Sequence, residues 1–111
     1  MSTLSTHVLD TMHGRPAAGL AVVLTGPHGE IARGVTNEDG RCPDLAPAEL
    51  APGRYAIRFA VADYFRAVGV ELPDPPFLDQ VTVDFGIAAD GGHYHVPLLV
   101  SPYGYSTYRG S

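Results

Sequence analysis

Three of the five histidines lie in two stretches of alternating residues, one near each end of the 111-residue chain. His7 lies in the first stretch, and His93 and His95 lie in the last. Successive side chains of a β-strand point to opposite faces, so His93 and His95 share one face of their strand. In both stretches the more apolar residues occupy the other face, which we expect to pack on the core. Because a neutral imidazole is a usable base near neutral pH, these histidines are candidates for acid–base chemistry.

The same three histidines raise the alternative of a zinc site. His93 and His95 project to one side and could share a metal with His7, and a catalytic zinc takes three protein ligands. Neither Glu nor Cys stands near them in the sequence to complete a ligand set. Histidine is the commonest metal ligand, but most histidines have other roles. The sequence therefore favours metal-free acid–base chemistry, with a zinc-dependent hydrolase as the alternative.

Arg41 is the candidate for holding an anion or a flat ligand with adjacent oxygens. It follows the Asp39-Gly40 turn, and loops at strand ends commonly carry functional residues. Its planar guanidinium presents a fork of donors that suits such ligands, although a solvated turn arginine is the other interpretation. A serine nucleophile is a weaker candidate, because no Gly-x-Ser-x-Gly motif surrounds any serine, Ser5 included.

Composition limits the class of protein. The chain is long enough for one core, and we predict a single domain over residues 1–111. The net charge of -5 and the scattered arginines argue against nucleic acid or an anionic membrane as a partner. No apolar run approaches the roughly 20 residues of a membrane span, and no signal peptide is evident. The single Cys42 suits a reducing compartment, so a cytoplasmic protein is expected.

Short alternating runs separated by turn residues predict an all-β fold. Ten prolines and thirteen glycines punctuate the chain, as is typical of a β-sandwich or barrel. Seven or eight strands are expected, among them residues 4–9, 20–25, 30–36, 54–60, 80–87 and a terminal hairpin that begins at residue 93. Residues 42–45 are predicted as a short edge strand, although Pro43 limits its length. The one convincing helix is residues 61–68, which ends at Gly69, a favourable C-cap residue.

Several motifs resemble the transthyretin family. The first is Leu-Ser-Thr-His-Val-Leu-Asp at residues 4–10, followed by Gly-Arg-Pro-Ala at 14–17. The others are Thr-Asn-Glu-Asp-Gly-Arg at 36–41, His-Tyr-His-Val-Pro-Leu-Leu at 93–99, and the closing Tyr-Arg-Gly-Ser at 108–111. The resemblance spans the whole chain, and the closing tetrapeptide is its most specific part. It points to the enzyme branch of the family, which hydrolyses 5-hydroxyisourate, and not to the hormone carriers.

The resemblance implies a fold, an assembly and a reaction. The fold is a sandwich of two four-stranded sheets with one short helix. The assembly is a homotetramer, a dimer of dimers that joins subunits through their last strands and encloses the active sites in a central channel. The implied reaction is the hydrolysis of 5-hydroxyisourate to 2-oxo-4-hydroxy-4-carboxy-5-ureidoimidazoline, the step after urate oxidation, with no metal or organic cofactor.

The resemblance also implies the site residues. The catalytic residues, which also bind substrate, would be His7, Arg41 and His95. Further substrate-binding residues would be Tyr108 and Ser111, while His93, His13 and His28 would have a lesser role or none. Other residue types replace the three catalytic residues and the tyrosine in the hormone carriers, so their presence favours the enzyme. A carrier whose channel binds an aromatic ligand without turnover is the alternative.

Overall fold

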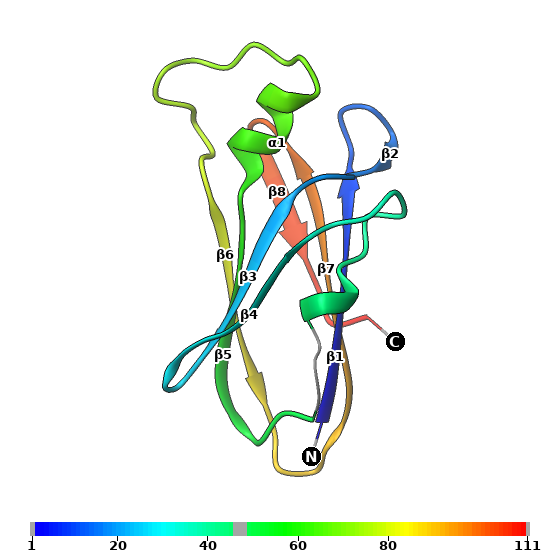
Figure 1. The fold of residues 1–111 in the computed structure, drawn as a ribbon, viewed down its shortest axis with the longest axis vertical. Coiled ribbons are helices and arrows are strands. Elements are labelled where there is room, and N and C mark those ends of the chain that lie inside the picture. Colours follow the sequence, from blue (N-terminus) through cyan, green and yellow to red (C-terminus); the bar gives the residue numbers. More distant parts are fainter. Residues whose placement is uncertain (1, 46–48, 111) are drawn as a thin grey trace.

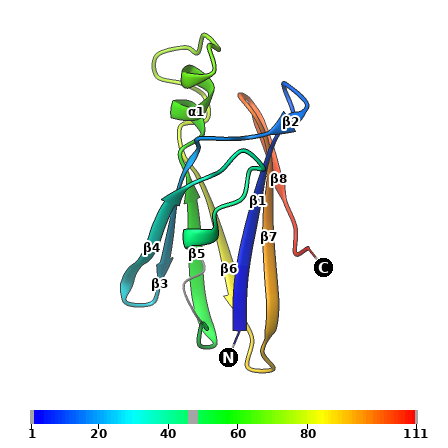
Figure 2. The same ribbon diagram turned by 45° about the vertical axis from the view of Figure 1, so that its right-hand side comes forward.

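Two facing sheets of four strands each form the molecule in a computed structural model, which describes residues 2–45 and 49–110 (Figures 1 and 2). The first sheet has the order β2-β1-β7-β8, with bounds Arg15–Pro16, Ser2–Asp10, Gly92–Ser101 and Gly104–Thr107. The second sheet has the order β4-β3-β5-β6, with bounds Gly29–Val35, Ala21–Gly26, Gly53–Phe59 and Val81–Ile87. The predicted all-β sandwich of two four-stranded sheets with one short helix is confirmed.

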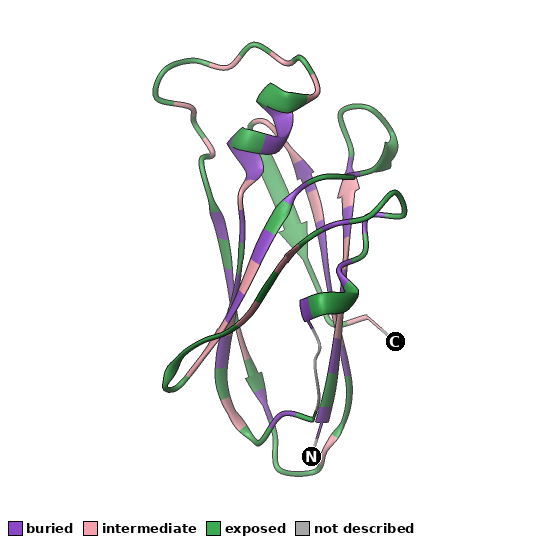
Figure 3. Cartoon of the chain, viewed as in Figure 1, coloured by how far each residue is buried: buried purple, intermediate pink, exposed green. Residues whose placement is uncertain are grey.

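The core lies between the sheets because each strand turns its apolar face inward. In β1, the side chains of Leu4, Thr6 and Val8 are buried while those between them are partly exposed. Figure 3 shows the resulting alternation of buried and exposed positions along the strands. The largest fully buried side chains include Phe59, Phe65, Leu20, Leu24, Leu45, Ile57 and Leu98. Full burial of one such side chain stabilises the fold by about 1.5–3 kcal/mol, so the inward face of each strand is strongly specified.

The strand that begins the chain and the one near its end lie side by side. β1 and β7 pair in parallel from Ser2↔Gly92 to Asp10↔Val100, whereas every other strand pair of the described residues is antiparallel. β8 then returns along β7 after a turn and forms the edge of the sheet. This arrangement places residues about 90 positions apart in the sequence in direct contact.

The α-helix α1, Val61–Ala67, follows β5 directly and covers one end of the sandwich (Figure 1). Its inward face consists of four buried residues, Val61, Ala62, Tyr64 and Phe65. The helix stops before Gly69, whose φ of +90° an L-residue rarely adopts. The predicted helix is confirmed, and the structure ends it one residue earlier. Within the described residues, no helix has the length and hydrophobicity that a bilayer crossing requires.

One predicted element is wrong. Residues 42–45 are not an edge strand, because Pro43–Leu45 form a short 3₁₀ helix in which the Leu45 amide donates to the Cys42 carbonyl over 3.1 Å. Pro43 has no N–H to give to a sheet, and the helical turn carries the Leu45 side chain into the core, where it is fully buried. The structure also adds β2, a two-residue strand at Arg15–Pro16 that the sequence pattern did not predict.

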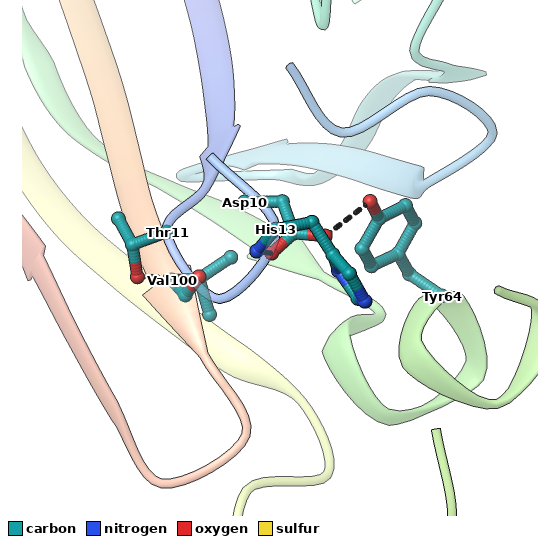
Figure 4. A network of polar contacts seen from close by, with 5 residues as sticks. All are labelled: Asp10, Thr11, His13, Tyr64 and Val100. Carbon is teal, nitrogen blue, oxygen red and sulfur yellow. Dashed lines mark hydrogen bonds and ion pairs between the residues drawn. The ribbon is translucent and has the colours of Figure 1, made fainter. Parts of the chain in front are cut away.

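A buried carboxylate ties β1 to the helix. Asp10 ends β1, is almost fully buried, and accepts hydrogen bonds from the His13 amide (2.9 Å) and His13 Nδ1 (2.6 Å). It also accepts one from the Tyr64 hydroxyl (2.7 Å), which Figure 4 shows. Burial alone would raise the pKa of Asp10, but these donated hydrogen bonds outweigh it and hold that pKa below its ordinary value. Burial and the adjacent carboxylate raise the pKa of Tyr64 to about 12. The Asp10 carboxylate is therefore ionised in the folded protein, and its hydrogen bonds hold the loop after β1 against α1.

Asp10→Asn is expected to lower the free energy of unfolding by about 1–3 kcal/mol at pH 7, because an amide cannot accept all three bonds. The pKa of Asp10 is depressed by folding, so its contribution is full above the unfolded-chain value of about 4. The contribution disappears as the pH falls through the lower pKa of the folded protein. Urea unfolding at pH 7 and at pH 3 should therefore show a gap between wild type and variant that closes in acid.

The control for this substitution is Asp63→Asn. The Asp63 side chain is 81% exposed and forms only a 3.8 Å ion pair with Arg66. An exposed pair of this kind contributes about 0–1 kcal/mol, so the control should stay near wild type. A gap for Asp10→Asn that is as small as that of the control, or independent of pH, would contradict the role given to the buried carboxylate.

Candidate active site

The predicted histidines meet on the outer face of the first sheet. In the parallel pairing of β1 and β7, Ser5 lies opposite His95 and His7 lies opposite Pro97. Their strand neighbours Leu4, Val8 and Val96 fill the core, so alternation turns Ser5, His7 and His95 outward. His7 and His95 are half-buried at neighbouring positions of adjacent strands. The sheet therefore brings together two imidazoles that stand 88 residues apart (95 minus 7).

Arg41 is placed directly beside His7 on the other side of β1. The two residues form an isolated antiparallel bridge, and the Val8 amide donates to the Gly40 carbonyl over 2.8 Å. The turn before Arg41 is held by the Asn37 side chain, whose Oδ1 accepts from the Asp39 and Arg41 amides at 3.0 and 3.1 Å. The predicted Asp39-Gly40 turn thus delivers a guanidinium to the edge of the histidine pair.

The C-terminal segment lies against His95 on the remaining side. The Gly110 amide donates to the His95 carbonyl over 2.8 Å. A Cβ atom on Gly110 would lie 2.4 Å from His95 Cδ2, so the glycine backbone is in direct contact with the imidazole ring. Arg109 anchors this segment, since its guanidinium carbon lies 3.9 Å from the centre of the Tyr94 ring and its Nη2 donates to the His93 carbonyl.

His95 is the most constrained imidazole of the group. Its Nδ1 is hydrogen-bonded to Ser5 Oγ at 2.7 Å, which directs Nε2 away from the strand pair. Burial lowers the pKa of His95 below its ordinary value, and the nearby charges of three basic side chains, Arg41, His7 and His93, lower it further. At neutral pH the ring is therefore uncharged, which is the form that accepts a proton.

The other predicted site residues are placed less closely. Tyr108 follows the end of β8 with 59% of its surface exposed, and within residues 2–45 and 49–110 no hydrogen bond joins it to His7, Arg41 or His95. Ser111 lies outside the described residues. His93 is exposed and is linked to His95 by a hydrogen bond to Ser5. His13 belongs to the buried Asp10 group.

Ser5 is the functional-site residue that sequence reasoning missed. It was set aside because no nucleophile motif surrounds it, whereas its hydroxyl contacts both His93 Nε2 (2.8 Å) and His95 Nδ1 (2.7 Å). The two-residue spacing of Ser5 and His7 could have placed both on one face, but the pairing of β1 with β7 was needed to see the contact. Among the described residues, no group of three His, Cys, Asp or Glu side chains is arranged to hold a metal ion.

The chain is similar over its whole length to known proteins. A family model described as HIUase/Transthyretin family matches residues 4–110. A 5-hydroxyisourate hydrolase of Pseudomonas aeruginosa is 53% identical over an alignment that covers 100% of this chain and 93% of the relative. The solved structure of Klebsiella pneumoniae 5-hydroxyisourate hydrolase matches with a TM-score of 0.88 and 40% identity, covering 100% of both chains.

The fold alone does not separate hydrolases from carriers. A solved structure of sea bream transthyretin in complex with thyroxine matches with a TM-score of 0.84 and 30% identity, covering 96% of this chain and 93% of that one. Both kinds of protein therefore share the two-sheet arrangement. Evidence for one activity or the other therefore has to come from the side chains of the candidate site and not from the fold.

Proposed function

Because the chain belongs to the HIUase/Transthyretin family, we propose that it hydrolyses 5-hydroxyisourate to 2-oxo-4-hydroxy-4-carboxy-5-ureidoimidazoline, the step after urate oxidation. One observation carries this proposal: His7, Arg41 and His95 lie on adjacent segments of one sheet face, and the His95 ring is uncharged. Two imidazoles beside a guanidinium can activate water and stabilise an oxyanion, whereas a carrier needs neither. The chain is a hydrolase of purine degradation.

The mechanism that this geometry supports is His-assisted attack of water on a cyclic amide. His95 Nε2 removes a proton from water while the oxygen bonds to the C6 carbonyl carbon of the ring. The ring carbon–nitrogen bond then breaks as His95 passes this proton to the departing nitrogen, and the carboxylic acid that forms releases water's second proton to solvent to become a carboxylate. His7 positions the water, and acid–base assistance of this kind accelerates reactions by about 10²–10⁴-fold.

Arg41 opposes the negative charge that develops on the carbonyl oxygen. Its backbone is held beside His7 by the bridge to β1, so the exposed guanidinium extends from a fixed position next to the histidine pair. The same planar fork of donors suits the adjacent oxygens of the substrate. By family resemblance, Tyr108 and Ser111 are the further substrate-binding residues. The reaction uses neither a metal ion nor an organic cofactor.

The active form is a homotetramer, a dimer of dimers, in the cytoplasm. This assignment is supported by the exposed edge of the first sheet, since all four residues of β8 are exposed and Tyr103, Tyr105 and Tyr108 gather along it. An edge strand with free backbone groups and aromatic side chains is suited to pairing with a second copy. Two such dimers, packed through the outer faces that carry the histidines, would enclose the sites.

The experiment that tests the function is a decay assay with freshly prepared 5-hydroxyisourate. The purified protein should accelerate loss of the substrate absorbance at micromolar or lower enzyme concentration. Arg41→Glu should abolish the acceleration, because it places a negative charge where the oxyanion forms. Saturable binding of substrate without turnover by the wild type would support the carrier alternative and end the hydrolase proposal.

Gly110→Ala is expected to lower kcat/KM by about 10–100-fold, because the added methyl group would displace the His95 ring that it contacts and small displacements of catalytic groups have costs of this size. The free energy of unfolding should change little, since Gly110 is only partly buried and lies outside the core. The matched control is Gly104→Ala, whose Cβ would meet only Ser101 Oγ at 3.8 Å. Equal activity of the two variants in steady-state assays would show that the segment does not support His95.

A further inference from the structure

An unbroken line of hydrogen bonds crosses β1 and β7 beside the site. His95 Nδ1 contacts Ser5 Oγ at 2.7 Å, Ser5 Oγ contacts His93 Nε2 at 2.8 Å, and His93 Nδ1 contacts Thr3 Oγ1 at 2.7 Å. The parallel register explains the line, because Thr3 pairs with His93 and Ser5 pairs with His95 on the same outer face. We call these four residues, Thr3, His93, Ser5 and His95, the outer-face chain.

The outer-face chain can be fully satisfied with both imidazoles neutral. If His95 Nδ1 donates to Ser5 Oγ, then the serine hydroxyl donates to His93 Nε2, and His93 Nδ1 donates to the threonine hydroxyl. In this arrangement each neutral ring carries one proton, as it must. The nitrogen left free is His95 Nε2, which then presents its lone pair away from Ser5.

The electrostatics of the two ends differ. His95 is half-buried, and the positive charges of Arg41, His7 and His93 act on it. Both effects disfavour the imidazolium form, in which both ring nitrogens carry a proton. His93 is exposed to solvent, where an imidazolium keeps much of its hydration. The charged group that contacts His93 from the terminal segment is Arg109, whose Nη2 donates to the His93 backbone carbonyl and whose guanidinium stacks over Tyr94. A positive charge is therefore better tolerated on His93, at the exposed end of the outer-face chain, than on His95.

We propose that Ser5 and His93 form a proton relay that carries positive charge from His95 to the solvent-exposed end of the outer-face chain while the tetrahedral intermediate exists. This inference rests on the proposed hydrolysis. When His95 Nε2 takes a proton from water, its Nδ1 proton moves to Ser5 Oγ, and the serine's own proton moves to His93 Nε2. His93 becomes the imidazolium and His95 is again neutral, now protonated on Nε2.

The second half of the reaction reverses the transfer. His95 gives its Nε2 proton to the departing ring nitrogen as His93 returns a proton to Ser5 and the serine returns one to His95 Nδ1. Over the cycle His95, Ser5 and His93 return to their starting protonation states, one proton of water ends on the leaving nitrogen, and the other is released to solvent when the product carboxylic acid ionises. Ser5 and His93 are positioning residues that act through His95, and the relay keeps a second cation away from Arg41 while the guanidinium stabilises the oxyanion.

The test is a double-mutant cycle on kcat with Ser5→Ala and His93→Gln. Each single variant should lower kcat by about 10–100-fold with little change in KM, since the relay serves the chemical step. Glutamine keeps a hydrogen-bonding side chain next to Ser5 but cannot take up the charge, so a purely structural role would tolerate it. The double variant should be no slower than the slower single variant, because either change breaks the same relay. Ser5→Thr, which keeps the hydroxyl, should have a kcat near that of the wild type, in contrast to Ser5→Ala.

A second readout separates proton movement from packing. Rates in mixtures of light and heavy water should give a curved dependence for the wild type, because several protons move together, and a straight line for Ser5→Ala. His28→Gln, a change of an exposed turn histidine, serves as the control and should match the wild type. Single variants within about threefold of wild-type kcat, or effects that multiply in the double variant, would overturn the relay. Absence of turnover by the wild type itself would overturn the proposed hydrolysis instead.

Discussion

His95→Asn is expected to lower kcat/KM by about 10²–10⁴-fold, the largest loss of activity among the neutral substitutions at the site. Asparagine places a polar group near the position of Nδ1, so the contact with Ser5 is kept. It has nothing at the position of Nε2, the nitrogen that would take the proton from water. The variant therefore removes the base while leaving the strand pairing and the core face of β7 intact.

Steady-state kinetics with 5-hydroxyisourate measure this effect, and circular dichroism with urea unfolding confirms that the fold is unchanged. The matched control is His28→Asn, an equivalent change in an exposed turn. A variant that keeps more than about a tenth of wild-type kcat/KM would show that His95 is not the base and would transfer that role to His7.

The pH dependence of the wild type offers an independent check on the same residue. Burial and the nearby basic groups lower the pKa of His95, so the neutral form persists at more acidic pH than for a free imidazole. The acid limb of kcat/KM, which reports the free enzyme, should therefore have its midpoint below the ordinary histidine value of about 6.5. Because His95 and its neighbours interact, that midpoint belongs to the group of histidines together.

Much of the site was predictable because core burial fixes which way each strand faces. Leu4 and Val8 had to point inward, so His7 had to point outward. In the same way, the inward-facing Val96 and Leu98 place His95 on the outer face of its strand. The side chains could be assigned to faces from the sequence alone. The grouping of His7, Arg41 and His95 into one site, however, came from family resemblance.

The contacts between distant segments were not predictable in the same way. Nothing in the alternation says that β1 pairs with β7 in parallel, and that pairing is what brings Ser5 to the histidines. Residues 42–45 show a second limit. A strand would bury the Leu45 side chain as well as the observed helical turn does, so its apolar character does not select between the two. Local pattern determines the face of a residue, whereas the partner across the sheet depends on how the whole sandwich closes.

Gly40→Ala is expected to lower the free energy of unfolding by about 2–5 kcal/mol, the largest loss of stability among the substitutions considered. Gly40 has a φ of +75°, which an L-residue adopts only with strain. Its Cβ would also lie 2.4 Å from the Val8 carbonyl oxygen. That oxygen already accepts a hydrogen bond from the Ala17 amide, and the Gly40 carbonyl accepts one from the Val8 amide. Neither strand nor turn can move away without breaking one of these bonds.

The control separates backbone strain from the close approach. Gly14 has a nearly equal φ of +68°, but a Cβ there would have no heavy atom within 4 Å. Gly14→Ala should therefore cost only the strain, about 1–2 kcal/mol. The difference between the two variants in urea unfolding measures the contact between the turn and β1. Equal losses would mean that this contact adjusts freely.

The folded fraction of Gly40→Ala should also lose activity, whereas Gly14→Ala should retain it. Val8 and Gly40 form the backbone contact next to the bridge between His7 and Arg41, so a methyl group there would push the Arg41 backbone away from His7. If Arg41 stabilises the oxyanion only from its bridged position, kcat should fall more than KM rises. The stability of the sandwich and the geometry of catalysis therefore both depend on the absence of a side chain at Gly40.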